Sequence, residues 1–271
     1  MQMTRIEADD DHRLADFADL REGDRRFCHP APAGARTVPA FALEGIRLVR
    51  RAVSGGYRPL AYLLHDGFDA SLLPPPPADV PVLQAPTALI KRVTGMGVIR
   101  EVVALFARPS PATPDDVIAG RRRVMVLNAV ANPVNLGLLL RTGAALGAEA
   151  TLLDAECTDH LYRRSVRGSM GAALTHPIAR LPDGHGLLEL LREHRIESVA
   201  FTPDPRADDL AAFRPSPETA LALMFGAEGA GLAPDLLDGA DHRLRIPMRG
   251  DVDSLNVAAA AAVAWYALGA S

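Results

Sequence analysis

The sequence predicts an α/β protein in two parts, with a mostly parallel sheet in the larger, C-terminal part. From residue 124 onward, apolar runs of strand length alternate with segments of helical pattern, which is typical of a parallel sheet covered on both faces. A proline-rich segment divides the 271 residues, and 48% of them are hydrophobic. The chain is therefore long and apolar enough to bury two cores.

The N-terminal part carries the pattern of a small α/β unit. Residues Phe41–Val53 have apolar side chains at helical spacing, and Leu60–Leu64 and Val80–Leu83 are apolar runs of strand length. The segment Arg108–Asp116 contains three prolines, which stop both helices and central strands. We therefore expect an N-terminal domain at 1–108, a linker at 109–117 and a C-terminal domain at 118–271.

The C-terminal part alternates strands and helices more clearly. Val124–Leu127 predicts a strand, followed by an Asn/Pro loop and a helical stretch. Ala150–Leu153 predicts the next strand, and helical patterns follow up to about Ala173. The remaining expected elements are a helix around 187–191, strands at 199–201, 220–225 and 244–246, and an alanine-rich helix at 257–270. Because ligands of such sheets bind beyond the carboxyl ends of the strands, the loops there are the candidate site.

Composition excludes several classes of protein. The two cysteines, Cys28 and Cys157, provide neither a disulfide framework nor a paired metal-ligand spacing, and the sequence has no HExxH motif. We therefore expect no metal and a reducing, cytoplasmic setting. The acidic start lacks the apolar run of a signal peptide, and the apolar end is shorter than the ~20 residues of a membrane span, so no membrane association is expected.

Arginine clusters are the main basic feature of the chain. The formal net charge is −4, which argues against a protein held on nucleic acid by bulk charge alone. The clusters are Arg25–Arg26, Arg47–Arg51, Arg121–Arg123 and Arg163–Arg167. Each could be a solvated face, or could contact phosphates, which the planar guanidinium matches with two donors.

The first motif with chemical content is Asn132-Pro-Val-Asn135-Leu-Gly137, with Arg141 following. It leaves a predicted strand and opens a helix, so Arg141 is expected to face the same crevice as Asn135. The simpler alternative is an ordinary helix cap with a surface arginine.

Two further motifs follow later strands. Gly226-Ala-Glu228-Gly229-Ala-Gly231 comes directly after a strand, and its glycines would let the backbone approach a ligand, although it is not the dinucleotide-binding GxGxxG. Ile246-Pro-Met248-Arg-Gly and Ser254-Leu255-Asn256-Val257 compress a strand end, a loop and a helix start into twelve residues. The alternatives are a glycine-rich turn with a solvated Glu228, and a helix that is merely capped.

Together and in this order, the three motifs resemble the SpoU (TrmH-like) family of RNA 2'-O-ribose methyltransferases in the SPOUT superfamily. The resemblance covers about residues 124–268, and Arg167–Ala172 is similar to the family's arginine-containing helix. Residues 13–108 resemble, more weakly, the small ribosomal-protein-like RNA-binding domain of many members, best at Phe41–Gly45. Where such domains often have His-Arg-Gly, this chain has Ile99-Arg100-Glu101.

The resemblance implies a trefoil-knotted parallel-sheet catalytic domain preceded by a small α/β RNA-binding domain, in a homodimer whose active site draws on both subunits. It implies S-adenosylmethionine as methyl donor, bound at Gly226, Gly229, Ile246, Met248 and Leu255. The expected catalytic residues are Asn135, Arg141, Glu228, Ser254 and Asn256, and Arg167 is expected to bind RNA. We expect Arg141 to grip the reacting 2'-oxygen and its neighbouring phosphate rather than to act as a free base.

Competing functions are a non-catalytic RNA-binding module with a relict cofactor pocket, and a serine hydrolase built on Ser169. The first would be favoured by loss of Asn135, Arg141 or Asn256, which are all present. The second lacks the Gly-x-Ser-x-Gly pattern, because Arg167 stands where the first glycine belongs. The two-domain layout favours ribosomal over transfer RNA as substrate, and the sequence does not identify the nucleotide or its base.

Overall fold

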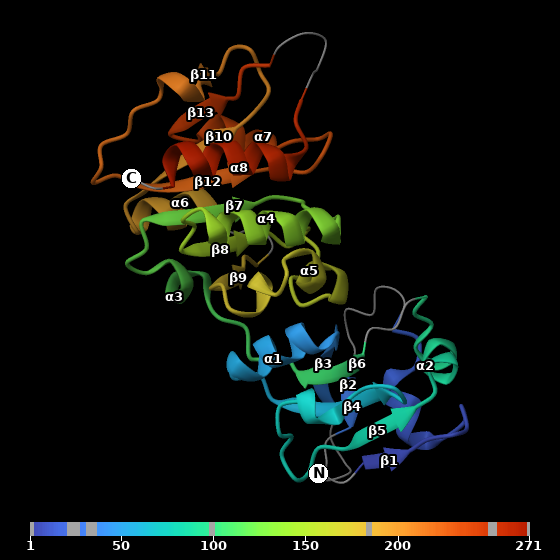
Figure 1. Ribbon diagram of the computed structural model, residues 1–271. Coiled ribbons are helices and arrows are strands. Elements are labelled where there is room, and N and C mark those ends of the chain that lie inside the picture. The colour runs from blue at the N-terminus through green and yellow to red at the C-terminus, as the bar shows by residue number, and fades with distance from the viewer. Residues whose placement is uncertain are drawn as a thin grey trace. The chain divides into compact units, whose positions relative to one another are not determined.

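The computed structural model describes residues 3–20, 28–30, 37–97, 101–182, 186–248 and 254–269, with backbone only at 28–30 and 37. It divides into two compact units (Figure 1). The first consists of Met1–Ser110 and Leu161–Arg167, and the second of Pro111–His160 and Gly168–Ser271. Ile99 and Arg100, which stand where related RNA-binding domains often have His-Arg, lie outside the described residues.

The first unit is built on a six-stranded mixed sheet of order β1-β5-β4-β6-β3-β2. Strands β1, β5 and β4 pair in parallel, and the other pairs are antiparallel. Its elements are β1 (Met3–Arg5), η1 (His12–Phe17), β2 (Cys28–Pro30), β3 (Thr37–Glu44), α1 (Ile46–Ser54), β4 (Pro59–His65), η2 (Ala70–Leu72), β5 (Val82–Ala85), α2 (Thr87–Thr94) and β6 (Val102–Ala107).

The expected single helix over Phe41–Val53 is wrong in its first part. Strand β3 continues to Glu44, and α1 begins only at Ile46. Phe41 pairs with Phe106 of β6, so sheet pairing overrides the helical spacing of the apolar residues. Gly45 has φ 91°, a conformation that suits glycine and separates strand from helix.

The second unit contains the parallel sheet that the sequence predicts. Seven strands lie in the order β11-β13-β10-β12-β7-β8-β9, and every pair is parallel. The strands are β7 (Arg123–Leu127), β8 (Ala150–Leu153), β9 (Ile178–Arg180), β10 (Ile196–Phe201), β11 (Asp208–Asp209), β12 (Ala220–Phe225) and β13 (His242–Arg245).

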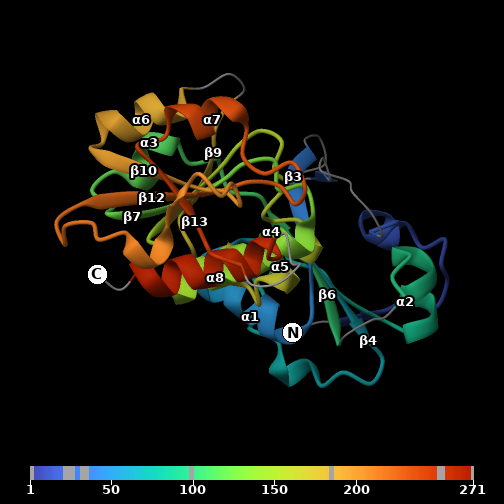
Figure 2. The same cartoon turned by 90° about the horizontal axis from the view of Figure 1, so that it is seen from above.

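Helices cover both faces of this sheet (Figure 2). Helices α3 (Pro114–Ile118), α6 (Leu187–Glu193) and α7 (Pro234–Gly239) lie on one face and share a core of Val, Ile and Leu side chains with it. Helices α4 (Pro133–Ala145) and α8 (Val257–Leu268) pack against each other on the opposite face. Among the described residues, no helix has the length and hydropathy needed to cross a bilayer.

Two connections differ from the simple expectation. The second half of the expected linker is the start of α3, since Thr113 caps the helix by accepting a hydrogen bond from the Asp116 N–H at 3.1 Å. The expected helical stretch to about Ala173 is broken into α5 (Arg163–Gly168) and η3 (Ala172–Leu174). The break falls at Met170 and Gly171, which both have positive φ and so cannot continue a right-handed helix.

Candidate functional site

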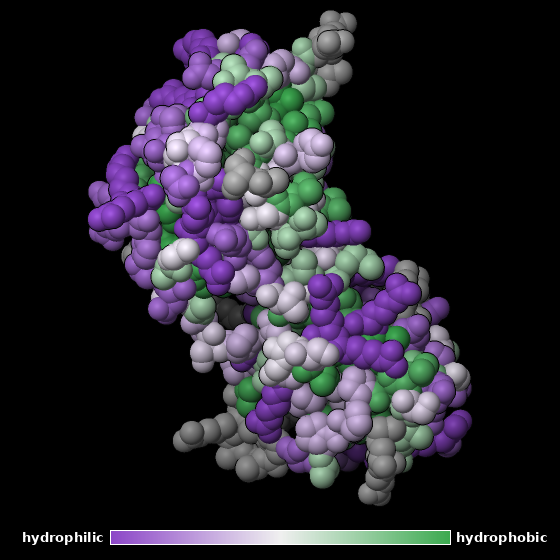
Figure 3. Space-filling view, turned by 60° about the vertical axis from the view of Figure 1, so that its left-hand side comes forward, coloured by the Kyte–Doolittle hydropathy of each residue, from purple (hydrophilic) through white to green (hydrophobic). Residues whose placement is uncertain are grey.

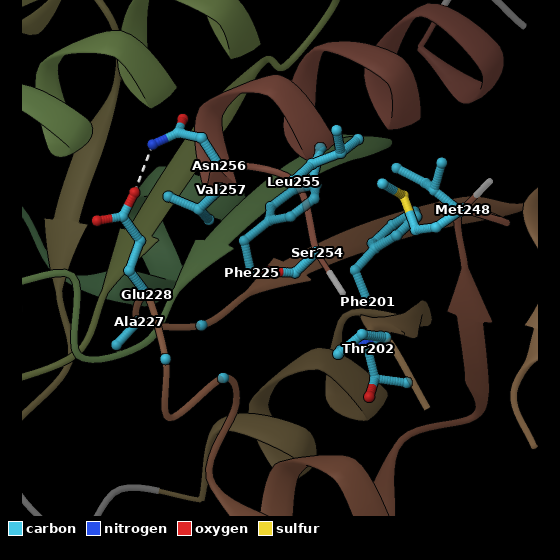
Figure 4. A pocket seen from close by; sticks show the side chains of 16 residues that line it. Phe201, Thr202, Phe225, Ala227, Glu228, Met248, Ser254, Leu255, Asn256 and Val257 are labelled. Atoms are coloured by element: carbon cyan, nitrogen blue, oxygen red, sulfur yellow. Dashed lines mark hydrogen bonds between the residues drawn. The ribbon is translucent and has the colours of Figure 1, made fainter. Parts of the chain in front are cut away.

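A pocket of about 380 Å³ lies in the second unit, beyond the carboxyl ends of β10, β12 and β13 (Figure 4). Strands of one parallel sheet end along one edge, which brings together loops that are far apart in the sequence. Its lining residues are Phe201, Thr202, Pro203, Phe225, Gly226, Ala227, Glu228, Gly229, Gly231, Ile246, Met248, Ser254, Leu255, Asn256, Val257 and Ala260.

The loop after β12 is a tight glycine turn. The Gly231 N–H donates to the Ala227 carbonyl at 2.9 Å, and Gly229 and Gly231 have φ of 88° and 73°. Gly226 is buried, and a Cβ atom there would overlap the backbone of Gly231 and Leu232. The turn therefore depends on Gly226 for space and on the other two glycines for backbone conformation.

Glu228 and Asn256 meet at the pocket (Figure 4). The Asn256 amide donates a hydrogen bond to the Glu228 carboxylate, and its oxygen accepts from the Ala258 N–H at 3.0 Å, which caps α8. The amide thus fixes the exposed carboxylate against the start of the helix. Helix capping, the simpler alternative for this motif, is therefore present as well. The cap uses the amide oxygen of Asn256, and the contact with Glu228 uses the amide nitrogen.

An apolar wall faces these polar groups. Phe201 and Phe225 stack with ring centroids 5.0 Å apart and planes 12° apart. Ile246, Met248 and Leu255 also line the pocket. Neither Phe201 nor Phe225 was among the expected site residues, although both stand at the ends of predicted strands, which was a usable signal.

The structure brings eight of the eleven expected site residues together. All five positions expected for the methyl donor line the pocket, as do Glu228, Ser254 and Asn256. The three that do not are Asn135, Arg141 and Arg167. A ligand site at these strand ends is therefore supported by geometry as well as by motif.

Asn135 and Arg141 do not face one crevice, which corrects that expectation. Six helical residues turn the chain by about 600°, so the two side chains differ in direction by about 120°. Asn135 is buried with 7% of its surface exposed, whereas Arg141 is exposed. Arg141 shares the exposed face of α4 with Val134 and Leu138, and it has no hydrogen-bond or ion-pair partner within the described part of the chain.

Arg167 belongs to the first unit, where it contacts a buried carboxylate. Its guanidinium lies 3.5 Å from Oε2 of Glu44, which is 4% exposed, and Arg163 donates to the same oxygen at 3.1 Å. The Arg167 side chain remains 46% exposed. One side of the Arg167 guanidinium therefore contacts Glu44, and its exposed side can bind an anion.

Fold and site together define a parallel-sheet α/β domain with a glycine-walled pocket beyond its strand ends. The SpoU rRNA Methylase family matches residues 122–266, which is more than half of the chain. An uncharacterized tRNA/rRNA methyltransferase of Mycobacterium tuberculosis is 39% identical over 259 residues, which are 95% of this chain and 88% of that protein. The chain belongs to the SpoU family of methyltransferases.

Other relatives extend the likeness. The 23S rRNA (guanosine(2553)-2'-O)-methyltransferase RlmP of Bacillus subtilis is 32% identical over 156 residues, which are 57% of this chain and 61% of that protein. An AdoMet-bound rRNA methyltransferase from Sinorhizobium meliloti is 25% identical with a TM-score of 0.76, covering 98% of this chain and 97% of that one. A solved RNA 2'-O ribose methyltransferase has the same TM-score and identity, and covers 97% of each chain.

Proposed function

We propose that this protein is an S-adenosylmethionine-dependent RNA 2'-O-ribose methyltransferase that acts on ribosomal rather than transfer RNA. The observation that carries the proposal is the convergence of the glycine loop, the Glu228–Asn256 pair and the strand end at Ile246 on one pocket. The names of RlmP and of the solved ribose methyltransferase support the 2'-oxygen as acceptor. The S. meliloti structure supports the methyl donor.

The pocket fits S-adenosylmethionine in size and chemistry. Its volume of about 380 Å³ lies within the ~300–1,000 Å³ of small-molecule sites. The stacked Phe201 and Phe225 offer an apolar wall suited to an adenine ring, and the Gly226 turn exposes backbone groups that can bind polar atoms. When bound, this cofactor supplies an electrophilic methyl group.

The chain's own residues would act mainly by positioning. A guanidinium stays protonated in proteins and so stabilises negative charge better than it removes a proton. Arg141 would bind the reacting 2'-oxygen and the adjacent phosphate, and stabilise the developing alkoxide. Asn256 and Glu228 would orient groups at the pocket, with Asn135 supporting the start of α4 from within and Ser254 shaping the donor site.

A homodimer completes the proposal. Large apolar side chains are exposed on the two helices that pack on one face of the sheet: Val134, Leu138, Val263 and Tyr266, the last of them 82% exposed. Hydrophobic residues reach the surface of the second unit in Figure 3 as well. A second copy on this face would bury these side chains and bring Arg141, which lies beside Leu138, towards the partner's pocket.

RNA recognition would involve exposed arginine residues of the first unit. Arg47 and Arg51 on α1, and Arg164 and Arg167 on α5, are exposed and could contact phosphates. We expect the pocket segments at 226–232, 246–248 and 254–256 to belong to the trefoil knot of the family, which would hold the methyl donor, and the enzyme to work in the cytoplasm.

Mapping of 2'-O-methylated nucleotides tests the proposal. RNA from cells with and without the gene is compared, and the purified protein is then given S-adenosylmethionine and RNA from the deletion strain. We expect one or a few ribosomal sites to lose the mark in the deletion strain and to regain it in vitro. A lost site in transfer RNA would overturn the choice of substrate, and unchanged methylation with no activity in vitro would overturn the enzyme and favour a binding module.

A further inference from the structure

Two polar side chains that no motif includes form a clasp beyond the ends of β7 and β8. Asn128 follows β7 and Asp154 follows β8, in adjacent strands of the sheet. The Asn128 amide Nδ2 donates to Oδ2 of Asp154 at 2.5 Å. The same carboxylate oxygen accepts the Ala129 N–H at 2.8 Å, and its Oδ1 accepts the Cys157 N–H at 2.8 Å.

The other end of the Asn128 side chain binds the segment that follows the glycine turn of the donor pocket. Its Oδ1 accepts a hydrogen bond from the Ala233 N–H at 2.9 Å. Ala233 follows the glycine turn and caps α7, so this bond anchors the end of the loop that begins at Gly226. One amide thus joins the chain after β7 to the loop after β12.

Asp154 also holds a strained residue. Ala129 has φ 55°, a left-handed conformation that is strained for a non-glycine residue. Its N–H is held by Asp154, and its carbonyl accepts from the Ala131 N–H at 2.9 Å. The chain then turns directly into Asn132, whose side chain caps α4 through the Val134 N–H at 2.9 Å. The start of the helix that carries Arg141 is therefore set by a conformation that Ala129 does not favour by itself.

Arg180 binds the backbone of the loop after β8. Its guanidinium donates to the carbonyls of Asp154 at 2.6 Å, Cys157 at 2.8 Å and Thr158 at 2.9 Å. Burial, together with the nearby Asp154 charge, raises the pKa of the Cys157 thiol to about 12, so the thiol keeps its proton and donates to the Leu127 carbonyl at 3.2 Å. The loop that carries Asp154 is therefore held by hydrogen bonds from Arg180 and Cys157.

We propose that Asn128 and Asp154 are a positioning pair for methyl transfer, which holds the start of α4 at a fixed place relative to the glycine turn of the donor pocket. The inference rests on the proposed function. Neither residue touches the pocket, so both act through others: Asp154 through Ala129 and the start of α4, and Asn128 through Ala233 as well.

The two members should have separable effects, because they hold different loops. Asp154→Asn keeps the size of the side chain but leaves too few acceptors for three donors, and it turns an amide towards the Asn128 amide. We expect it to slow single-turnover methylation of deletion-strain RNA 10- to 100-fold, with the Kd for S-adenosylmethionine changed less than threefold. Asn128→Ala should slow turnover and also raise that Kd at least fivefold, because Ala233 loses its acceptor.

Rescue separates positioning from mere stability. Glycine adopts the left-handed conformation without strain, so Ala129→Gly in the Asp154→Asn background should recover at least fivefold in turnover. Glu156→Gln is the matched control, since Glu156 is an exposed carboxylate of the same loop without a partner among the described residues. A turnover rate of Asp154→Asn within twofold of wild type, or no recovery in the double variant, would overturn the proposal.

Amide hydrogen exchange tests the clasp without reference to catalysis. Asp154→Asn should speed exchange of the Ala129 N–H at least tenfold, and Asn128→Ala should do the same for the Ala233 N–H. Unchanged exchange at both positions would refute the clasp even if the enzyme is active. If wild type fails to methylate any RNA, the proposed function fails, while the exchange result still decides whether the clasp exists. If Asp154→Asn does not fold, Asn128→Ala alone carries the test, and normal Kd and exchange in it would refute the pair.

Discussion

Replacement of Arg141 by alanine separates catalysis from folding. Arg141 is the ninth of thirteen residues in α4, is exposed, and has no partner within the described part of the chain. Alanine is the better helix former by a few tenths of a kcal/mol, so the free energy of unfolding should change by less than about 0.5 kcal/mol. The Arg141 side chain therefore contributes little to the stability of the single chain.

The catalytic effect should be much larger. If Arg141 stabilises the developing alkoxide, its contribution is greatest in the transition state, so turnover should fall roughly 10²–10⁴-fold. That corresponds to about 2.7–5.5 kcal/mol of activation free energy, which is far above the change in stability. Affinity for S-adenosylmethionine should barely change, since Arg141 does not line the pocket. Arg141→Lys should recover little, because an ammonium does not reproduce the planar fork.

The assay is single-turnover methylation of deletion-strain RNA at saturating S-adenosylmethionine, with thermal unfolding measured on the same preparations. Arg214→Ala is the control, because Arg214 is an exposed arginine whose one hydrogen-bond partner among the described residues is the carbonyl of the residue before it. A rate near that of wild type in Arg141→Ala would refute the catalytic role. A loss of rate matched by a loss of folded protein would refute the separation from stability.

Three other perturbations test the pocket, the dimer and the core. Gly226→Ala should weaken S-adenosylmethionine binding at least tenfold in calorimetry, because the new Cβ would overlap the backbone of Gly231 and Leu232. Gly229→Ala should weaken binding fivefold or less, because it introduces only the strain of φ 88°. Equal effects of the two variants would contradict this account of the turn. If the protein is the proposed homodimer, Tyr266→Asp should convert it to a monomer in sedimentation velocity, because Tyr266 is 82% exposed on the apolar face. An unchanged mass would exclude that face as the interface. Burial lowers the pKa of His176 from 6.5 to about 4, so its neutral form stabilises the fold fully above pH 6.5, and this contribution is lost as the pH falls towards 4. Between pH 7 and 4 wild type should therefore lose on the order of 3 kcal/mol more unfolding free energy than His176→Gln, and parallel pH curves in denaturant titrations would disprove it.

The parallel sheet and most of the pocket could be predicted from the sequence alone. The strands at Val124–Leu127, Ala150–Leu153 and Ala220–Phe225 are apolar except for Thr151, because both faces of the sheet are covered, and this pattern can be seen in the sequence without knowledge of the strand register. The residues of the glycine loop and of the last helix start are contiguous in the sequence, so their local chemistry could be predicted before the fold was known. Gly226, Glu228 and Asn256 belong to this group.

Features that depend on partners far away in the sequence could be seen only in the folded chain. Phe41–Glu44 is a strand because β6, some sixty residues later, pairs with it, and local spacing carries no trace of that partner. Asn128 and Asp154 meet because β7 and β8 are neighbours, although 26 residues separate them and neither stands in a motif. Asn135 is buried and Arg141 is exposed because of the way α4 packs on α8 and the sheet. The sequence of a helix does not by itself show which of its sides the neighbouring elements cover.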